Sequence, residues 1–457
     1  MRRPRVLTLF AGAVIAASTS IAIATPAQAA PAAALDEVDQ YIVQFKPGAD
    51  RSSALATLGQ RFGVQLTTER ELSIGAHVIK ANKRTAGLLK ALQALGVVEY
   101  AEPDTMMQAL STPNDPLYNQ QWDLFETIGG INVPTAWDLS TGSGVIVAVI
   151  DTGKTSHPDL NAQWVGGYDF ISSASVARDG GGRDSDPTDP GDWYNAGECG
   201  SSTGSSSSWH GTHVAGTIAG VGNNSTGIAG IAYNAKILPV RVLGKCGGST
   251  SDIIDAITWA SGGSVAGVPA NTNVAKVINL SLGGSGSCST AMRNAINAAV
   301  NRGTTVVVAA GNSNANASGF SPANCPNVIT VAATNRAGSR AFYSNYGATV
   351  EISAPGGEVR LASDPAGSRT TPQDGILSTL NNGTTTIGTP NYWTYMGTSM
   401  AAPHVAGVVA LMKSKNPSLT PAQILSKLQS TARALPGTCS GGCGAGIVNA
   451  AAAVAAA

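Results

Sequence analysis

Five almost continuous apolar runs lie between residues 145 and 333, and stretches with helical spacing lie between and after them. Strands without polar alternation are typical of a parallel sheet that is buried on both faces. The runs cover residues 145–150, 236–243, 274–282, 304–310 and 328–333, and the helical stretches cover residues 212–220, 249–260, 289–302, 399–415 and 420–431. This alternation predicts an α/β fold, in which a mostly parallel sheet carries helices on both faces.

The pattern is different in the first part of the chain. Residues 36–110 contain no cysteine and carry more charge than the residues that follow. Apolar spacing there predicts the order β, α, β, α, β, at residues 41–45, 52–62, 76–81, 85–95 and 97–100. We expect a small α+β domain of about 75 residues, which is near the lower limit for independent folding. Pro, Asn, Asp and Gly are frequent from residue 111, so the second domain is expected to cover residues 111–457.

The extreme N-terminus has the pattern of an export signal. Three arginines among the first five residues precede an apolar run, residues 6–24, and the sequence Ala-Gln-Ala at residues 27–29 fits a signal-peptidase site. The alternative is a membrane anchor. This run is diluted by Ala, Ser and Thr and ends at small residues, which favours a removable signal. We expect residues 1–29 to be a signal peptide and the protein to be secreted to the extracellular space, without a stable membrane anchor.

Composition narrows the range of partners. Hydrophobic residues make up 43% of the chain, which is enough for a sizeable core. Charged residues make up only 12%, and 28 basic residues balance 28 acidic ones, so the chain has no field that would concentrate a polyanion. We therefore expect no nucleic-acid partner, and we expect a monomer.

The six cysteines all lie in the second domain. An even number of cysteines in an exported chain indicates three disulfides, and a zinc site is the weaker interpretation because no CxxC pair occurs. Six cysteines allow fifteen pairings. We favour sequence neighbours, which are Cys199 with Cys246, Cys288 with Cys325, and Cys439 with Cys443.

Polar residues close three of the predicted strands. Asp151, Ser281 and Asn312 come directly after apolar runs. The carboxyl ends of parallel strands meet at one edge of a sheet, and that edge is where chemistry gathers. A carboxylate there can orient a histidine, although Asp151 by itself is equally well explained as a turn or cap residue.

Ser399 and His210 each stand at the start of a predicted helix. Small residues surround Ser399, and the free N–H groups of a first helical turn can stabilise an oxyanion. Taken alone, Ser399 is better explained as a helix N-cap, and His210 as a surface or core histidine. A zinc protease is disfavoured, because residue 211 is Gly and cannot supply the general base of an HExxH motif, so neither His210 nor His213 belongs to one.

Longer motifs bring these residues together. They are Val-Ile-Asp-Thr-Gly at 149–153, His-Gly-Thr-His-Val-Ala-Gly-Thr at 210–217, Ala-Ala-Gly-Asn at 309–312 and Gly-Thr-Ser-Met-Ala-Ala-Pro-His at 397–404. With them the chain resembles the subtilisin family, or subtilases, from about residue 41 to residue 454. The order Asp, His, Ser is the one that subtilisin itself uses.

The resemblance implies a serine endopeptidase that acts on protein and peptide substrates. Ser399 would be the nucleophile, His210 the general base and then acid, and Asp151 the group that orients and stabilises the imidazolium. Asn312 would be the side chain of the oxyanion hole, acting with the backbone N–H of Ser399. The span between Asp151 and His210 departs from the family pattern by an insertion that carries residues 178–193 and Cys199, and we expect this insertion to be a surface loop.

The resemblance also implies that the first domain is an inhibitory propeptide, which would act as an intramolecular inhibitor until the protein cleaves itself between Leu110 and Ser111. Leu110 would then occupy the S1 pocket. The residues implied in substrate binding are Ser281, Leu282, Gly283 and Gly284 in S1, and Gly247 and Gly248 near S4. Residues 313–322 contain no Asp or Glu to pair with a basic P1 side chain, so we expect a broad preference for apolar P1 residues.

Structural calcium is the one cofactor that the resemblance implies, and no organic cofactor is expected. The implied ligands are the side chains of Asp115, Asp159 and Asn224 with the carbonyls of Val221, Thr226 and Ile228, a set of hard oxygens that suits Ca²⁺. A second site could use Asp184, Asp186, Asp189 and Asp192, although such a run is equally well explained as a solvated acidic loop.

Two other classes of function compete with a protease. A non-catalytic subtilase fold that acts as a binding protein would need a broken triad or oxyanion position, and all four residues are intact. A nucleotide-binding enzyme could be argued from the glycine and asparagine run at residues 220–224. That run lacks both GxGxxG spacing and a Walker lysine.

Overall fold

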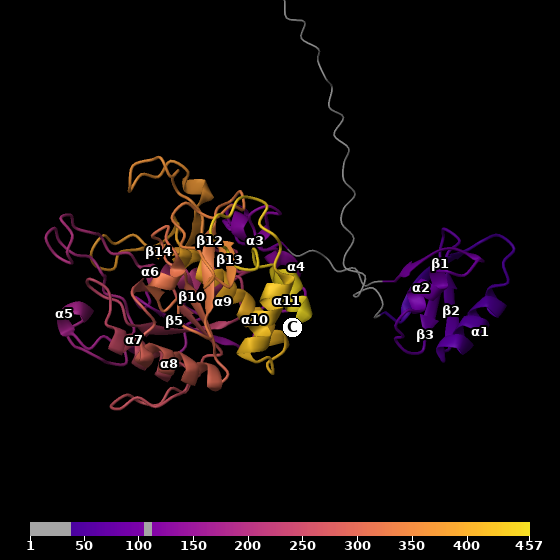
Figure 1. Ribbon diagram of the computed structural model, residues 1–457, viewed down its shortest axis with the longest axis horizontal. Coiled ribbons are helices and arrows are strands. Elements are labelled where there is room, and N and C mark those ends of the chain that lie inside the picture. Colours follow the sequence, from indigo (N-terminus) through magenta and orange to yellow (C-terminus); the bar gives the residue numbers. More distant parts are fainter. Residues whose placement is uncertain (1–37, 105–111) are drawn as a thin grey trace, which may run out of the picture. The chain divides into compact units, whose positions relative to one another are not determined.

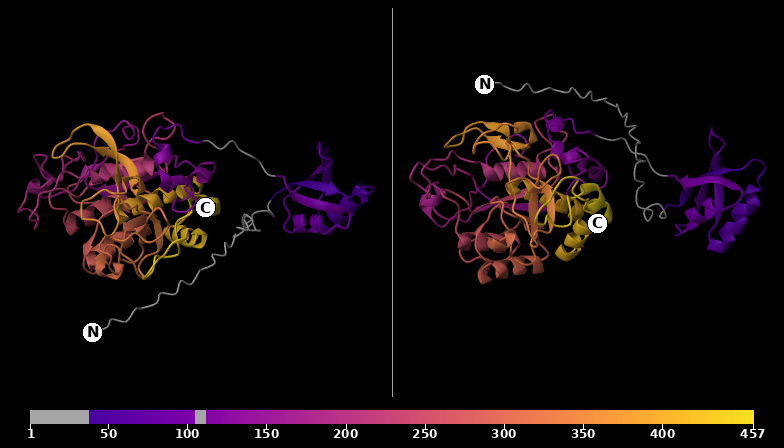
Figure 2. Two further views of the ribbon diagram at one scale, coloured as in Figure 1. Left: turned by 90° about the horizontal axis from the view of Figure 1, so that it is seen from above. Right: turned by 45° about the horizontal axis from the view of Figure 1, so that its top comes forward.

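The computed structural model describes residues 38–104 and 112–457, which form two compact units (Figures 1 and 2). The expected signal peptide, residues 1–29, and the expected cleavage site at Leu110 and Ser111 lie outside the described residues. None of the described helices has both the length and the apolar character needed to cross a membrane.

The first unit is a four-stranded antiparallel sheet with two helices, and its strand order is β2-β3-β1-β4. Its elements are β1 (Gln40–Phe45), α1 (Arg51–Phe62), β2 (Leu66–Glu71), β3 (His77–Ala81), α2 (Leu88–Gln93) and β4 (Val98–Pro103). Tyr41 and Val43 of β1 are buried in one core with Leu58 and Leu92 of the helices. The sequence pattern missed β2, because five of its six residues are exposed and no apolar alternation marks it.

The second unit is built on a seven-stranded parallel sheet with the order β13-β12-β10-β8-β5-β7-β6. The strands are β5 (Ile146–Asp151), β6 (Tyr168–Asp169), β7 (Lys236–Arg241), β8 (Val277–Leu280), β10 (Thr305–Ala309), β12 (Ile329–Thr334) and β13 (Ile352–Pro355). Every residue of β8, β10 and β12 is buried. Five of these strands lie where the apolar runs predict them.

Helices cover both faces of this sheet, as the sequence predicts (Figure 1). The helices α6 (His210–Ala219) and α9 (Thr398–Lys415) pack on one face, while α7 (Thr250–Ala260) and α8 (Thr290–Asn301) pack on the other. Successive strand residues point to opposite faces, and so Val149 belongs to the α9 core and Ile150 to the α7 core.

The remaining elements are short or peripheral. They are α3 (Trp122–Phe125), α4 (Val133–Trp137), α5 (Ala174–Ala177), β9 (Gly284–Ser285), β11 (Phe320–Ser321), β14 (Ile376–Asn381), β15 (Pro390–Tyr395), α10 (Pro421–Thr431) and α11 (Ala450–Ala456). The antiparallel hairpin β14–β15 packs beside α6. The C-terminal alanine run forms α11, where the Asn449 side chain accepts a hydrogen bond from the N–H of Ala452 and caps the helix.

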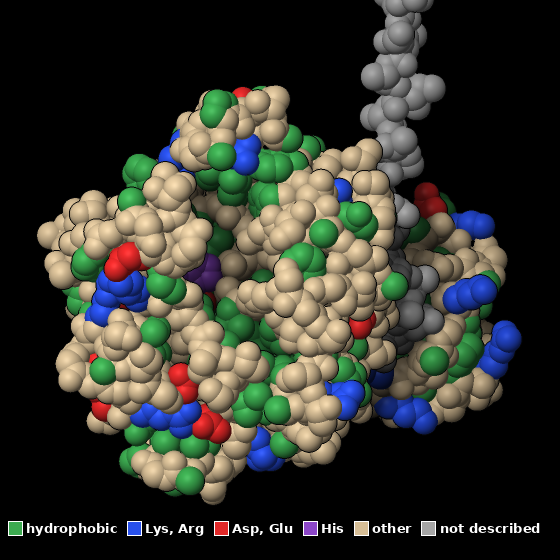
Figure 3. All heavy atoms as spheres, turned by 60° about the vertical axis from the view of Figure 1, so that its left-hand side comes forward, with side chains coloured by type: hydrophobic (Ala, Val, Ile, Leu, Met, Phe, Trp, Pro, Cys, Tyr) green, Lys and Arg blue, Asp and Glu red, His purple; other side chains and the backbone are tan. Residues whose placement is uncertain are grey.

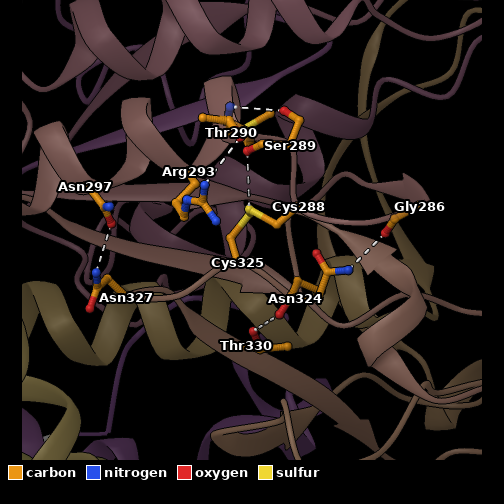
Figure 4. Close-up of a disulfide and its surroundings, with 12 residues drawn as sticks. Gly286, Cys288, Ser289, Thr290, Arg293, Asn297, Asn324, Cys325, Asn327 and Thr330 are labelled. Carbon is orange, nitrogen blue, oxygen red and sulfur yellow. Dashed lines mark hydrogen bonds between the residues drawn. A yellow bond between two sulfur atoms is a disulfide. The ribbon is translucent and has the colours of Figure 1, made fainter.

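All six cysteines are paired, in the arrangement of sequence neighbours: Cys199–Cys246, Cys288–Cys325 and Cys439–Cys443. Figure 4 shows the second of these, which joins the segment before α8 to the segment after β11. Nearby, Asn324 Nδ2 donates to the carbonyl of Gly286 at 2.9 Å. The disulfide therefore ties together two segments that approach the carboxyl edge of the sheet.

Candidate active site

Three neighbouring strands bring polar residues to one edge of the parallel sheet. Asp151 is the last residue of β5, Ser281 directly follows β8, and Asn312 comes three residues after β10. Because β10, β8 and β5 lie side by side and run in the same direction, these residues meet at the carboxyl edge. The order of the strands, which the apolar pattern did not predict, is what creates this proximity.

Asp151 and His210 form a hydrogen-bonded pair. Nδ1 of His210 lies 2.8 Å and 3.0 Å from the two carboxylate oxygens of Asp151, which is fully buried. Thr152 Oγ1 accepts a hydrogen bond from the N–H of Gly211 at 3.0 Å, which fixes the start of α6 beside β5. Since Nδ1 faces a carboxylate, it carries the proton, and Nε2 is left as the basic nitrogen.

The surroundings of His210 favour its charged form. Burial alone would lower the pKa of this imidazole, but the charge and hydrogen bond of Asp151, with the charges of Asp192 and Asp189, outweigh burial and raise its pKa. The nearby His213 is the opposite case. Burial first, and the charge of His210 second, lower the pKa of His213 to about 3, so it stays neutral and is no candidate base.

Ser399 lies in the first turn of α9. Its hydroxyl donates to the carbonyl of Ser281 at 3.2 Å, and its backbone N–H makes no hydrogen bond to another described residue. The structure does not join Ser399 to His210 by a hydrogen bond within the described ranges. The two residues line adjacent cavities that share Ser281. A free first-turn N–H next to a hydroxyl is suited to hold an oxyanion.

The orientation of Asn312 is set by its neighbours. Its Oδ1 accepts hydrogen bonds from both the N–H and the hydroxyl of Thr398, at 2.8 Å and 2.9 Å. The amide nitrogen Nδ2 therefore lies on the side of the amide that Thr398 does not contact, and it donates to no other described residue. Thr398 fixes the Asn312 amide and directly precedes Ser399 in the chain. Asn312 Nδ2 and the N–H of Ser399 are thus two unused donors next to Thr398.

A cavity of about 350 Å³ opens beside Ser399. Its lining contains no charged side chain. It is lined by Ser281, Leu282, Gly283, Gly284, Ser285, Ala309, Ala310, Gly311, Asn312, Ser313, Phe320, Ser321, Ala323, Thr398 and Ser399. The residues expected to form S1 are therefore brought together, and the segment after β11, held by the Cys288–Cys325 disulfide, forms a further wall.

A second, larger cavity of about 810 Å³ extends from His210. Gly247 and Gly248 line it, as expected for the region near S4. In Figure 3 the hollow on this face has a histidine side chain, drawn in purple, at its floor. Asp192 and Tyr194 of the inserted loop also line this cleft, together with the Cys199–Cys246 disulfide. The sequence named Asp192 only as a possible calcium ligand, and no motif marks Tyr194.

The first expected calcium site is assembled in part. Both carboxylate oxygens of Asp115 accept backbone N–H groups of the loop at residues 221–228, and Asp159 accepts the N–H of Ile228 at 2.9 Å. The carbonyls of Val221, Thr226 and Ile228 accept no hydrogen bond from a described residue. Asn224 turns its Nδ2 toward Asp159, at 2.7 Å, while its Oδ1 accepts the N–H of Thr226. Two carboxylates and three carbonyls without a described donor therefore lie around one loop, whereas the expected side-chain ligand of Asn224 is used inside the loop. Oxygens of this kind are the ligands that Ca²⁺ prefers.

The structure does not gather the carboxylates of the second expected calcium site around one point. Asp184, Asp186 and Asp189 each accept the N–H of the residue two positions later, and Asp192 binds the N–H and hydroxyl of Ser208. The four carboxylates therefore close separate turns. Across residues 38–104 and 112–457 no group of three or more His, Cys, Asp or Glu side chains is placed to hold a metal ion.

A buried Asp–His pair beside a helix-borne serine, at the carboxyl edge of a parallel sheet, defines a serine hydrolase. Residues 142–446 match the family model described as the subtilase family, and residues 27–104 match the one described as the fervidolysin N-terminal prodomain. The chain belongs to the subtilase family and is a subtilisin-like serine protease with an N-terminal prodomain. The nucleotide-binding and non-catalytic alternatives are therefore set aside.

Individual relatives agree with this assignment. The chain is 53% identical to an extracellular protease of Xanthomonas campestris pv. campestris, over 96% of this chain and 77% of that protein. It is 42% identical to an extracellular basic protease of Dichelobacter nodosus, over 91% of this chain and 70% of that protein. A solved protease structure from Pseudoalteromonas arctica is 59% identical, with a TM-score of 0.73, and covers 76% of this chain and 99% of that chain.

Proposed function

We propose that the protein is a secreted endopeptidase that cleaves peptide bonds through an acyl-enzyme formed on Ser399. His210 Nε2 takes the hydroxyl proton as Ser399 attacks the scissile carbonyl, and it returns that proton to the leaving amine. Asp151 holds the imidazole by Nδ1 and stabilises the imidazolium. Water then attacks the ester, with His210 again as the base. The observation that carries this proposal is the buried Asp151–His210 hydrogen bond at the sheet edge that also carries Ser281 and Asn312.

The oxyanion of each tetrahedral intermediate would be held by Asn312 Nδ2 and the N–H of Ser399. Both donors are free of other described partners, and Asn312 is fixed in orientation by Thr398. Fixed donors need no reorganisation when the negative charge develops. In subtilisin itself, loss of the corresponding donor lowers kcat by about 10² to 10³, and we expect a loss of the same order when Asn312 is replaced in this member of the family.

The P1 side chain would be apolar. The 350 Å³ cavity beside Ser399 has no carboxylate in its lining, so a buried Arg or Lys at P1 would be left without a counter-ion. The neutral side chains of Leu, Phe, Tyr and Met have a much smaller desolvation cost in such a cavity than a charged side chain has. Glycines at positions 283 and 284 leave room for their side chains.

Synthesis as a proenzyme is part of the proposal. Residues 1–29 would direct export, and the first unit would inhibit the protease until cleavage near Leu110 and Ser111. Leu110 would then have been the P1 residue, in agreement with an apolar S1 pocket. The match of residues 27–104 to a prodomain and the extracellular relatives support this order of events.

Calcium at the site of Asp115 and Asp159 would be structural. When bound, the ion would supply positive charge between two carboxylates and the loop at residues 221–228. Burial raises the pKa of Asp159 against the effect of its hydrogen bonds, so a cation there would stabilise an otherwise costly buried charge.

The variant Ser399→Ala tests the proposal. Both peptide hydrolysis and removal of the pro-region need the same nucleophile, so S399A should accumulate at proenzyme size and show no casein hydrolysis. Ser414→Ala is the matched control, because Ser414 lies in the same helix and its hydroxyl bonds only to the carbonyl of Ser143, at 2.7 Å. S414A should mature and hydrolyse casein as the wild type does. Maturation and hydrolysis by purified S399A would refute the assignment.

A further inference from the structure

Helix α9, which carries Ser399, has a proline in its second turn, Pro403. In a regular helix the N–H of residue 403 would bond to the carbonyl of Ser399, four positions earlier. Proline has no N–H, and its ring crowds that same carbonyl. The carbonyl of Ser399 therefore loses its helical partner and is turned out of the helix.

Ser281 supplies the missing partner. Its hydroxyl donates to the carbonyl of Ser399 at 2.8 Å, while its own carbonyl accepts the Ser399 hydroxyl at 3.2 Å. Two hydrogen bonds in opposite directions thus join the end of β8 to the first turn of α9. Ser281 is almost fully buried, at 4% exposure, so water does not replace these bonds easily.

Asn279 sets the direction of the Ser281 hydroxyl. It belongs to β8, is fully buried, and donates from Nδ2 to Ser281 Oγ at 2.9 Å. Its Oδ1 has no partner among the described residues. Because Nδ2 occupies the acceptor side of the hydroxyl, the hydroxyl hydrogen points to the carbonyl of Ser399.

We propose that the Ser281 side chain, oriented by Asn279, is a positioning residue for Ser399, which it holds at the point where Pro403 interrupts the helix. Ser281 is one of the residues that line the cavity, and its hydroxyl is used by the carbonyl of Ser399. The proposal rests on Ser399 being the nucleophile. In α9 one internal hydrogen bond is replaced by a hydrogen bond to the sheet edge. This hydrogen bond positions both the Ser399 hydroxyl and the Ser399 N–H relative to His210.

The first experiment compares Ser281→Ala with the wild type, using tagged protein that untagged wild-type enzyme has matured in trans and that has then been repurified. With the carbonyl of Ser399 left unpaired, kcat on a peptide anilide should fall at least tenfold while KM stays within about threefold, since a small displacement of reacting groups has large effects. The rate of labelling by a fluorophosphonate should fall in parallel. Ser281→Thr keeps a hydroxyl and should retain most of the activity.

The decisive experiment adds Pro403→Ala. This change restores the N–H at residue 403, so the carbonyl of Ser399 regains a helical donor and no longer depends on Ser281. On a logarithmic scale, S281A/P403A should therefore recover at least half of the decrease in kcat that S281A shows. Ser353→Ala is the control, because Ser353 also donates from a buried hydroxyl to a carbonyl, that of Cys443 at 2.7 Å, and its loss should leave kcat unchanged.

Two outcomes would overturn the proposal. One is a wild-type kcat and labelling rate in S281A, with S399A inactive, which would leave the nucleophile assignment intact. The other is an S281A/P403A variant in which the fold-reduction of kcat equals the product of the fold-reductions measured for S281A and for P403A. If S281A does not yield soluble protein, S281A/P403A must do so, because its unpaired carbonyl has been repaired, and failure of both variants would also count against the proposal.

Discussion

His210 lies in the field of three aspartates. Asp151 is its hydrogen-bonded partner, while Asp192 and Asp189 act on it through their charge. Asp192 and Asp189 belong to the inserted loop, so this loop affects the protonation of His210, the proposed base, as well as the lining of the cleft. The attraction of a carboxylate for the imidazolium raises the pH at which His210 loses its proton.

Asp192→Asn should change the pH dependence of activity through the pKa of His210. The change removes a negative charge near His210 but keeps an oxygen that can accept the N–H of Ser208. The pKa of His210 should fall, and the acid limb of the kcat/KM profile should move to lower pH by a few tenths of a unit to about one unit, more at low salt. Profiles measured with one anilide substrate at two ionic strengths would show this.

Asp186→Asn is the matched control for this experiment. Asp186 lies in the same loop, is exposed, closes a turn with Thr188, and is not among the charges that act on His210. Its profile should match that of the wild type. A shift of the acid limb to higher pH in D192N, or an equal shift in D186N, would contradict the electrostatic account.

At the scale of elements, the apolar runs predicted five of the seven strands of the parallel sheet and the helices on both faces. They succeeded because a strand buried on both sides has to be apolar along its whole length. They failed for β2, whose side chains face solvent, and for β6, which has only two residues. They also failed for β13, a buried strand of four residues in which Ser353 and Pro355 break the apolar run. The order of the strands and the docking of the inserted loop into the cleft depend on contacts between distant residues, which local patterns do not record.

Among the expected site residues, too, those that lie in local sequence motifs could be found from the sequence, and those that depend on distant contacts could not. Asp151, His210, Asn312 and Ser399 lie in long motifs, so the resemblance identified them, and the structure brings them to one edge. The sequence could not decide whether the Asp-rich run is a metal site or a solvated loop, because carboxylates that accept turn N–H groups have the same composition as carboxylates that bind a cation.

A prediction at this scale concerns the loop at residues 221–228. Binding of Ca²⁺ only to the folded state should stabilise it by about 2.7 kcal/mol at a hundredfold excess over Kd. An excess of chelator should therefore lower the temperature of thermal inactivation by several degrees, and added Ca²⁺ should restore it. Asp159→Asn should abolish the response to chelator, while Asp186→Asn should keep it. An unchanged inactivation temperature in chelator would exclude a structural calcium ion.

For the whole molecule, we expect the uncharged cavity beside Ser399 to determine the choice of substrate. Peptide anilides that differ only at P1 should give higher kcat/KM for Leu and Phe than for Arg and Lys, by at least tenfold, because an unpaired buried cation costs several kcal/mol. The difference should persist at high salt, since no surface charge is responsible for it. A preference for Arg or Lys would overturn the assignment of this cavity as an apolar S1 pocket, and it would leave the triad untouched.

Mapping a covalent adduct would show whether Ser399 is the nucleophile that the Asp151–His210 pair activates. The mature protein is treated with a serine-directed phosphonate until activity is lost, and its peptides are analysed by mass spectrometry. We expect one adduct per active molecule, located on Ser399. In His210→Ala the labelling should be at least a thousandfold slower. Complete inactivation with the adduct on another residue, or with Ser399 unmodified, would contradict this assignment.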